Sequence, residues 1–301
     1  MKISIYMLLA LASTALIASC VRESNIEPEL PRVPLELTYN YPEGAVKPVN
    51  GEVVNILSHP AKRQVGSYES ARSPFTTTLL PGEYKLYIYS HADGIQLDNA
   101  ENFDRAQLRA NANLAPIGPL YSAIVDSFYV DPMTWTRSLN CTMQPMSGII
   151  RLLIENNTGI NFTNFSGSLN GLVKSRLIAD GSALFDEGEG TYNFSTAFDA
   201  QTAQTTIDIP CLGIFNPHPD KNVAPRYTAK VAIDISTTAS PMPEHIERDI
   251  TAQLGELMGG APSALYQTVK IVIEGADLAH INIKISVLPW EDGGDTNYSA
   301  G

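Results

Sequence analysis

The sequence predicts a mainly β protein built from antiparallel β-sandwiches. Beyond residue 34, large apolar residues recur at every second position, which is the period of a β-strand. The apolar runs are short and are bounded by Gly, Pro, Asn or Asp, as strands joined by turns are. The strand–helix–strand alternation that is typical of a parallel sheet is missing. Strands with one buried and one wet face are therefore expected.

The clearest alternation lies near the C-terminus. In 227–235, Val231, Ile233 and Ile235 are separated by polar or small residues, and the same pattern returns in 269–274 and 280–288. The last two segments are close enough in the chain to form a hairpin. Earlier strands are predicted over 35–41, 52–57, 75–80, 83–90, 119–130, 148–154, 169–178, 191–198 and 205–215.

Two short helices are predicted between the strands. In 243–258, apolar residues recur at a spacing of three or four, Pro243 suits a first turn, and Gly259-Gly260 ends the pattern. A weaker helical pattern covers 100–110. Both helices are expected to cover a sheet edge or the end of a sandwich.

The first residues have the pattern of a lipoprotein signal. Lys2 precedes an apolar run over 5–17, and small residues then lead to Cys20. This order predicts a signal peptide over 1–19, with Cys20 acylated and left as the first residue of the mature chain. An ordinary signal peptide with a chance cysteine is the alternative. We expect a lipid-anchored protein of the bacterial outer membrane, on either face.

A tether and two domains follow the signal peptide. Residues 20–34 are rich in proline and glutamate, which favours an extended linker between the lipid and the folded body. The remaining length is enough for two domains. A change of strand set after the Pro132–Trp135 stretch divides them into 35–140 and 141–301.

Composition excludes several classes of function. The chain has 20 Lys and Arg against 32 Asp and Glu, a formal net charge of −12, which argues against nucleic acid as a partner. With 44% hydrophobic and 17% charged residues, it has the composition of a packed globular protein. Beyond Cys20, no stretch approaches the roughly 20 apolar residues of a spanning helix. Acyl chains on Cys20 would therefore provide the contact with the membrane.

Cys141 and Cys211 are the remaining cysteines. In an oxidising compartment they could form a disulfide. They could equally be two separate buried thiols that pack as small apolar side chains. Metal ligation is the least favoured of the three interpretations, because neither cysteine has a zinc-type spacing to other ligands.

No catalytic or metal-binding motif stands out. The five histidines have no ligand spacing, and neither a His-Glu-x-x-His pair nor a Gly-x-Ser-x-Gly elbow occurs. We therefore expect a protein that is not an enzyme and that has no cofactor. Asp186, Glu187 and Glu189 would be the first candidates for calcium ligands, but acidic glycine-rich loops are usually turns.

Exposed aromatic side chains would favour glycan binding. Trp135 with Tyr121, Phe128 and Tyr129 is one candidate surface. The strand that carries Tyr84, Tyr87 and Tyr89 is the other. Aromatic residues on strands more often pack a core or a cross-strand pair.

Several segments together resemble the fimbrillin-like lipoproteins of Bacteroidetes type V pili, which include anchor proteins at the pilus base. They are the Cys20 signal, the Pro/Glu tether, Leu80–Tyr89 (LPGEYKLYIY), Met143–Ile154 (MQPMSGIIRLLI) and Ile285–Glu291 (ISVLPWE). The resemblance implies two tandem transthyretin-like β-sandwich domains and a non-enzymatic role.

The resemblance also implies assembly with fimbrial subunits by strand exchange, a form of β-augmentation. In stalk subunits of this family, an Arg-specific protease removes the first strand; Arg32, Arg63 and Arg72 are candidate sites here. If 280–288 belongs to the second domain, no donor strand remains, which favours an anchor or accessory subunit. The alternative function is a surface glycan-binding lipoprotein of a polysaccharide-uptake system.

Overall fold

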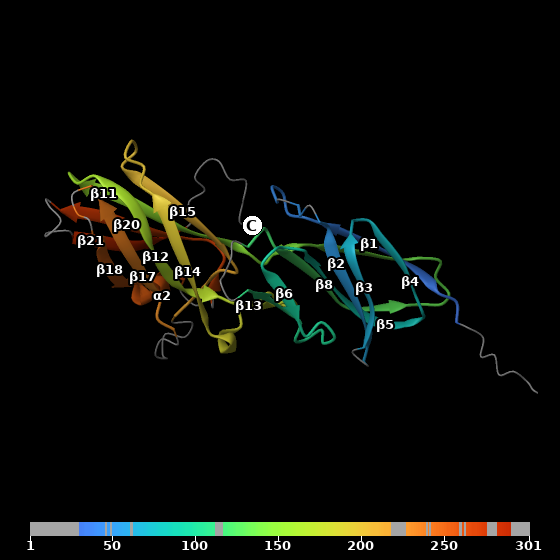
Figure 1. The fold of residues 1–301 in the computed structure, drawn as a ribbon. Coiled ribbons are helices and arrows are strands. Elements are labelled where there is room, and N and C mark those ends of the chain that lie inside the picture. Colours follow the sequence, from blue (N-terminus) through green and yellow to red (C-terminus); the bar gives the residue numbers. More distant parts are fainter. Residues whose placement is uncertain are drawn as a thin grey trace, which may run out of the picture.

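The computed structural model describes residues 30–45, 47–48, 50–60, 63–111, 117–217, 227–238, 240, 242–258, 261, 263–275 and 282–289. The signal peptide over 1–19, Cys20 and most of the tether lie outside these residues. The described chain is mainly β, as predicted. Figure 1 shows two groups of strands arranged end to end along one axis.

The N-terminal sandwich, as we call the first group, consists of two sheets. The smaller sheet has the order β4-β1-β9, with β1 at Val33–Asn40, β4 at Phe75–Leu79 and β9 at Arg137–Thr142. The larger sheet has the order β10-β8-β5-β2-β3, with β10 at Gln144–Pro145, β8 at Tyr121–Val130, β5 at Gly82–Ser90, β2 at Glu52–His59 and β3 at Gln64–Ala71.

Alternation along β1 explains how the two sheets meet. Val33, Leu35, Leu37 and Tyr39 are buried, whereas the residues between them are exposed or half-buried. These side chains share one hydrophobic cluster with residues of β2, β5 and β8 from the facing sheet. One strand thus supplies a row of core side chains, as period-two burial requires.

The C-terminal sandwich is the second group of strands. One sheet has the order β15-β11-β20-β21, formed by Gln204–Cys211, Gly148–Thr158, Gln267–Gly275 and Asn282–Leu288. The other has the order β18-β17-β12-β16-β19, formed by Glu244–Asp249, Lys230–Thr237, Phe162–Val173, Ile214–Phe215 and Ser263–Ala264. Strand β14 (Glu189–Ala197) also pairs with β12.

The prediction of purely antiparallel sheets is wrong for two strand pairs. β1 pairs with β9 in parallel, and β11 pairs with β20 in parallel. Parallel neighbours need a long connection. In both pairs about a hundred residues of chain separate the two strands, so a local sequence pattern cannot indicate the pairing.

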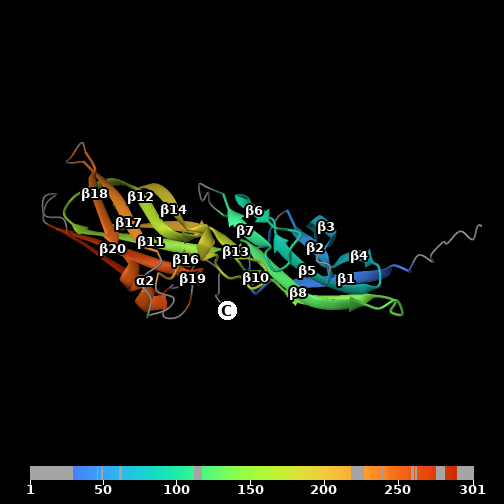
Figure 2. The ribbon, with the colours of Figure 1, turned by 90° about the horizontal axis from the view of Figure 1, so that it is seen from below.

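A fifth sheet, of three strands, joins the two sandwiches. β7 (Gln107–Ala110) from the first half lies between β6 (Ile95–Asp98) and β13 (Ser175–Leu177), which comes from the second half. Figure 2 shows this junction sheet in the middle of the molecule, in the region between the two sandwiches that we call the waist. Backbone hydrogen bonds therefore run directly from one half of the chain to the other.

The helix predicted over 100–110 is absent. Turns follow Asn99, and the chain then enters β7, where Leu108 and Ala110 are buried. Pairing with strands on both sides satisfies the backbone of β7, so tertiary contacts override the weak local preference for a helix.

The helix predicted over 243–258 is only half correct. Its first part is strand β18, and α2 covers Thr251–Met258. β18 pairs with β17, where Lys230 lies 2.7 Å from the carboxylate of Glu247. Asp249 then accepts a hydrogen bond from the N–H of Thr251 at 2.8 Å, which fits a helix that begins at Thr251.

The division at 140/141 falls within β9. Met143 still belongs to the hydrophobic cluster of the N-terminal sandwich, whereas Met146 belongs to the cluster of the C-terminal sandwich. The chain therefore passes from one hydrophobic cluster to the other between these two methionines. The domain boundaries of 35–140 and 141–301 stay a prediction.

The buried row of β1 yields a test of the N-terminal core. Leu37→Ala should lower the free energy of unfolding by about 2–5 kcal/mol, since Leu37 is fully buried and its truncation leaves a cavity. The measurement is urea unfolding of a chain that starts at Leu30 and so lacks the signal peptide and Cys20. Glu36→Ala, an exposed change on the same strand, is the control and should shift stability by less than about 0.5 kcal/mol. Equal effects of the two changes would contradict this assignment of the core.

Candidate functional site

Strands β8 and β9 each leave one edge open on the N-terminal sandwich. β8 pairs with β5 along its length, but its other side pairs only with the two residues of β10, at Tyr121 and Ser122. Among the described strands, none pairs with the outer side of Ala123–Val130, and β9 pairs only with β1. Unpaired backbone groups on a sheet edge are a template for an added strand.

A β-bulge divides the open edge of β8. The register to β5 shifts between Tyr84 and Leu86, opposite Asp126 and Ser127. Asp126 forms an ion pair with Lys85 at 2.8 Å, which fixes this irregular point. Bulges twist an edge and interrupt pairing. The edge therefore consists of two short straight segments, 123–125 and 128–130.

The last described strand, β21, pairs with β20 along its whole length. It forms an antiparallel hairpin with β20, from Thr268 opposite Leu288 to Glu274 opposite Asn282. Gln253 of α2 also donates a hydrogen bond to the carbonyl of Ile285 at 3.4 Å. The hairpin predicted for 269–274 and 280–288 is confirmed for the described residues. β21 is thus a native strand of the C-terminal sandwich.

The edge strand β18 differs from β8 in its charge. Across the pair with β17, Glu247 lies 2.7 Å from Lys230, and His245 lies 2.7 Å from Asp234. Five of its six residues are exposed. Charged side chains on an edge disfavour the addition of another strand. Of these two edges, β8 is the better acceptor.

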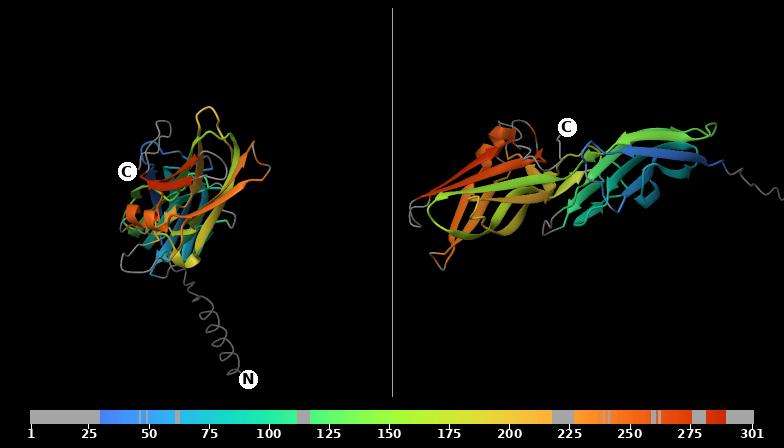
Figure 3. Two further views of the ribbon diagram at one scale, coloured as in Figure 1. Left: turned by 90° about the vertical axis from the view of Figure 1, so that its left-hand side faces the viewer. Right: turned by 90° about the horizontal axis from the view of Figure 1, so that it is seen from above.

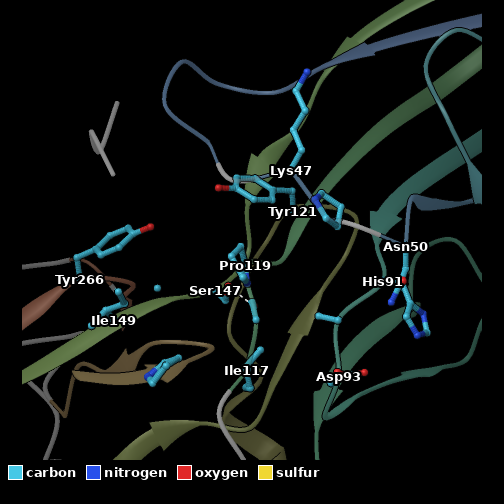
Figure 4. A pocket seen from close by; sticks show the side chains of 15 residues that line it. Lys47, Asn50, His91, Asp93, Ile117, Pro119, Tyr121, Ser147, Ile149 and Tyr266 are labelled. Carbon is cyan, nitrogen blue, oxygen red and sulfur yellow. Dashed lines mark hydrogen bonds between the residues drawn. The ribbon is translucent and has the colours of Figure 1, made fainter. Parts of the chain in front are cut away.

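A cleft of about 640 Å³ lies at the waist between the two sandwiches. Its lining includes Lys47, His91, Asp93 and Tyr121 from the first half of the chain and Tyr266 from the second, which lies across the cleft in Figure 4. Ser147 lies in the cleft wall, but its Oγ accepts a hydrogen bond from the N–H of Leu120 at 2.9 Å and donates one to the carbonyl of Gly118 at 3.2 Å. These bonds give Ser147 a structural role.

Most of the aromatic residues proposed for a glycan surface are buried. Tyr84, Tyr87, Tyr121 and Phe128 belong to the hydrophobic clusters, and Tyr89 packs against one of them. Within the first candidate surface only Trp135, at 94% exposure, and Tyr129, at 57%, face solvent. The tyrosine strand is therefore part of the core.

In the exposed loop after β8, the sequence indicated Trp135 as part of a candidate surface but did not indicate Met133. Met133 is 85% exposed in this loop, two residues before Trp135. In the sequence, the Pro132–Trp135 stretch precedes the predicted domain boundary. A methionine and a tryptophan in a polar turn were the available signal, because neither residue is needed to form a turn.

Cys141 and Cys211 are free thiols in the structure, so the disulfide considered above is not formed. Cys141 packs against the N-terminal cluster and Cys211 lies in the C-terminal cluster. Burial raises the pKa of Cys141 to about 11 and that of Cys211 to about 12. The two residues therefore have the alternative arrangement, separate thiols packed as apolar side chains.

The acidic loop considered for calcium lies at the junction. Arg109 of β7 forms an ion pair with the carboxylate of Glu187 at 3.0 Å, so this side chain has a cationic partner. Glu189 is partly buried, which raises the pKa of its carboxyl. Over the described ranges, no three His, Cys, Asp or Glu side chains are grouped so that they could hold a metal ion. No helix among the residues that the structure describes has the length and apolar character of a membrane span.

Comparison with known proteins finds the fold but no close relative. No family model matches the sequence, and no curated protein matches it. The fold is similar to that of a candidate adhesin from Bacteroides ovatus, with a TM-score of 0.57, 12% identity, and coverage of 81% of this chain and 90% of that one.

Two further solved structures share the fold. The fimbrial anchor protein Mfa2 from Porphyromonas gingivalis has a TM-score of 0.52 and 9% identity, with 86% of this chain and 98% of that one covered. A candidate polysaccharide-binding protein from Bacteroides thetaiotaomicron has a TM-score of 0.51 and 11% identity, with 86% and 99% covered. At the level of the fold, these structures confirm the resemblance to fimbrillin-like proteins.

The raised thiol pKa values yield a test. At pH 8, both cysteines of a soluble chain that starts at Leu30 should react with iodoacetamide at least about 100-fold more slowly than in the unfolded chain. A thiol with a pKa near 11 has about a hundredth of the thiolate of one near 9. The rates are measured by mass spectrometry, with the chain in 8 M urea as the control. Rapid native labelling of Cys211 would contradict its burial.

Proposed function

We propose that the protein is a lipid-anchored component of the bacterial cell envelope that serves as an anchor or accessory subunit in pilus assembly and cell adhesion. The role is structural, not catalytic. Acyl chains on Cys20 would hold it at the outer membrane, and two transthyretin-like domains would form its folded body. The shared fold with a fimbrial anchor and with a candidate adhesin supports this proposal.

The observation that carries the proposal is the contrast between a paired last strand and an open β8 edge. A subunit that donates a strand needs a segment that is not used in its own sheets. β21 is paired along all seven of its residues, and β1 lies between β4 and β9 with its apolar side chains buried. Among the described residues, neither terminal strand is left over for donation, whereas the outer edge of β8 could accept a strand.

Strand complementation would take place at the outer edge of β8. An incoming strand would hydrogen-bond to 123–125 and 128–130 and extend the larger sheet of the N-terminal sandwich. Main-chain hydrogen bonds would supply affinity, and side chains at alternate positions would supply specificity. The partner would be a fimbrial subunit with a free alternating strand.

The candidate protease sites fit a chain that keeps its first strand. Arg32 precedes β1, so cleavage after it would leave β1 in place. Arg63 lies between β2 and β3, and Arg72 lies between β3 and β4, so cleavage there would cut the N-terminal sandwich within its own sheets. We therefore propose that assembly of this subunit needs no removal of β1.

Glycan capture is less well supported. One neighbour of the same fold is a candidate polysaccharide-binding protein. In this chain, however, only Trp135 and Tyr129 of the first aromatic surface are exposed, and the tyrosine strand is in the core. A platform for sugar rings needs several exposed aromatic faces beside polar groups.

Cys20→Ala tests the anchoring. The variant should move from the membrane fraction to the soluble fraction, because each buried methylene of an acyl chain contributes about 0.8 kcal/mol to membrane binding. Pili should then be recovered from the medium and not from the cells. Cys141→Ala is the control and should leave both distributions unchanged. Pili that stay on Cys20→Ala cells, or a Cys20 peptide without acyl mass in the unaltered protein, would contradict the proposal.

A further inference from the structure

Exposed apolar side chains gather at the outer end of the N-terminal sandwich. Among the described residues, eight large hydrophobic side chains are exposed, and five of them lie near this end. We call these five the end patch: Leu30, Leu80, Tyr129, Met133 and Trp135. Contiguous exposed apolar surface usually marks a contact with a partner or a membrane.

The strand registers place these residues at one end. Val33 at the start of β1 is opposite Leu79, so Leu30 and Leu80 lie beyond the same end of the smaller sheet. Gly82 at the start of β5 is opposite Val130, which places the turn before β5 next to the loop after β8. Figure 3 shows the loop after β8 and the beginning of β1 at the end farthest from the C-terminal sandwich.

Hydrogen bonds hold the patch in an exposed conformation. In the loop after β8, a carboxylate oxygen of Asp131 accepts a hydrogen bond from the N–H of Met133 at 2.8 Å. The carbonyl of Asp131 accepts one from the hydroxyl of Thr134 at 2.8 Å. In the turn before β5, Tyr84 donates a hydrogen bond to the carbonyl of Leu80 at 2.8 Å. The apolar side chains therefore project from ordered turns.

The length of the tether limits what can cover the patch. Leu30, the first described residue, is ten residue steps from Cys20 along the chain. An extended chain of this length spans about 36 Å at most, and a polyproline-type chain spans about 31 Å. If Cys20 carries lipid, the end patch stays within that distance of the bilayer surface.

The chemistry of the patch matches the interfacial region of a bilayer. Tryptophan and tyrosine prefer the level of the lipid headgroups, where an apolar ring and a polar group are both satisfied. Arg32 and Arg137 are exposed at the same end, next to Val33 and opposite Leu35 respectively. Their guanidinium groups complement lipid phosphates.

We propose that the end patch inserts into the headgroup region of the membrane that holds Cys20, with Trp135 and Met133 as its deepest residues. This proposal rests on the lipid anchoring proposed above. Two contacts, the acyl chains and the patch, direct the long axis away from the bilayer. The end of β8 nearest the C-terminal sandwich then stands about 30 Å above the membrane, because Tyr121 and Val130 are nine strand steps apart.

Depth-dependent quenching of Trp135 tests the insertion. Trp290→Phe leaves Trp135 as the single tryptophan of the lipidated full chain. The protein is reconstituted in vesicles of phosphatidylethanolamine and phosphatidylglycerol that contain lipids brominated near the headgroup or near the chain end. Shallow bromines should reduce the emission at least about twofold, and deep bromines should reduce it less.

The matched control places a tryptophan at the other end of the molecule. Met242, between β17 and β18, is 75% exposed. In a Trp135→Phe/Trp290→Phe chain, Met242→Trp should give emission that neither bromine position quenches. Equal quenching of both reporters would overturn the proposal.

The outcomes separate insertion from anchoring. If mass spectrometry finds no acyl chain on Cys20 and the protein does not float with vesicles, the proposed function fails first. If the protein is lipidated and floats but Trp135 is not quenched, the insertion is wrong while the anchoring stands. In that case, shielding of Trp135 from acrylamide in cells but not in vesicles would assign the end patch to a protein partner instead.

Discussion

The pairing of β7 with β13 is the constraint on which the architecture depends. Three consecutive residue pairs, from Gln107 opposite Leu177 to Arg109 opposite Ser175, connect two halves of the chain that otherwise form separate sandwiches. Further backbone hydrogen bonds extend the connection on both sides, from the N–H of Ala110 to the carbonyl of Lys174 and from the N–H of Ile178 to the carbonyl of Ala106. Leu108 and Ala110 of β7 belong to the same hydrophobic cluster as the C-terminal sandwich. A sheet and a hydrophobic cluster shared by both halves therefore connect the two sandwiches.

Arg176 supports this junction from inside the C-terminal sandwich. Its buried guanidinium donates hydrogen bonds to the carbonyls of Leu212 and Gly181, both at 2.6 Å, and to the hydroxyl of Ser263 at 3.0 Å. Burial lowers the pKa of Arg176 to about 10, so the group stays charged at neutral pH. One side chain of β13 thus connects three separate loops and strands beside the pairing with β7. The open edges of β8 and β9 and the end patch lie on the half of the molecule that this junction connects to the C-terminal sandwich.

The sequence predicted what depends on local alternation and missed what depends on distant pairing. The rows of apolar residues in β1, β17, β20 and β21 identify these strands, and the short connection between the last two identifies their hairpin. Residues 107–110 and 244–249 are strands because β13 and β17 pair with them; β13 comes from the second half of the chain, whereas β17 is the strand directly before β18. Whether a side chain is buried or exposed also depends on residues that are distant in the sequence. Tyr87 and Trp135 are both aromatic residues in candidate surfaces, yet Tyr87 is in the core and Trp135 faces solvent.

Photo-cross-linking at the β8 edge in intact cells tests most directly whether this chain accepts a strand. A benzophenone side chain is introduced at Ser127, an exposed position on β8, and, as the control, at Glu244 on the charged edge strand β18. If β8 accepts a strand, the Ser127 variant should form an adduct with a terminal strand of a fimbrial subunit, identified by mass spectrometry, and the Glu244 variant should not. Adducts to fimbrial subunits from Glu244 alone, or from neither position in cells that assemble pili normally, would contradict strand acceptance at β8.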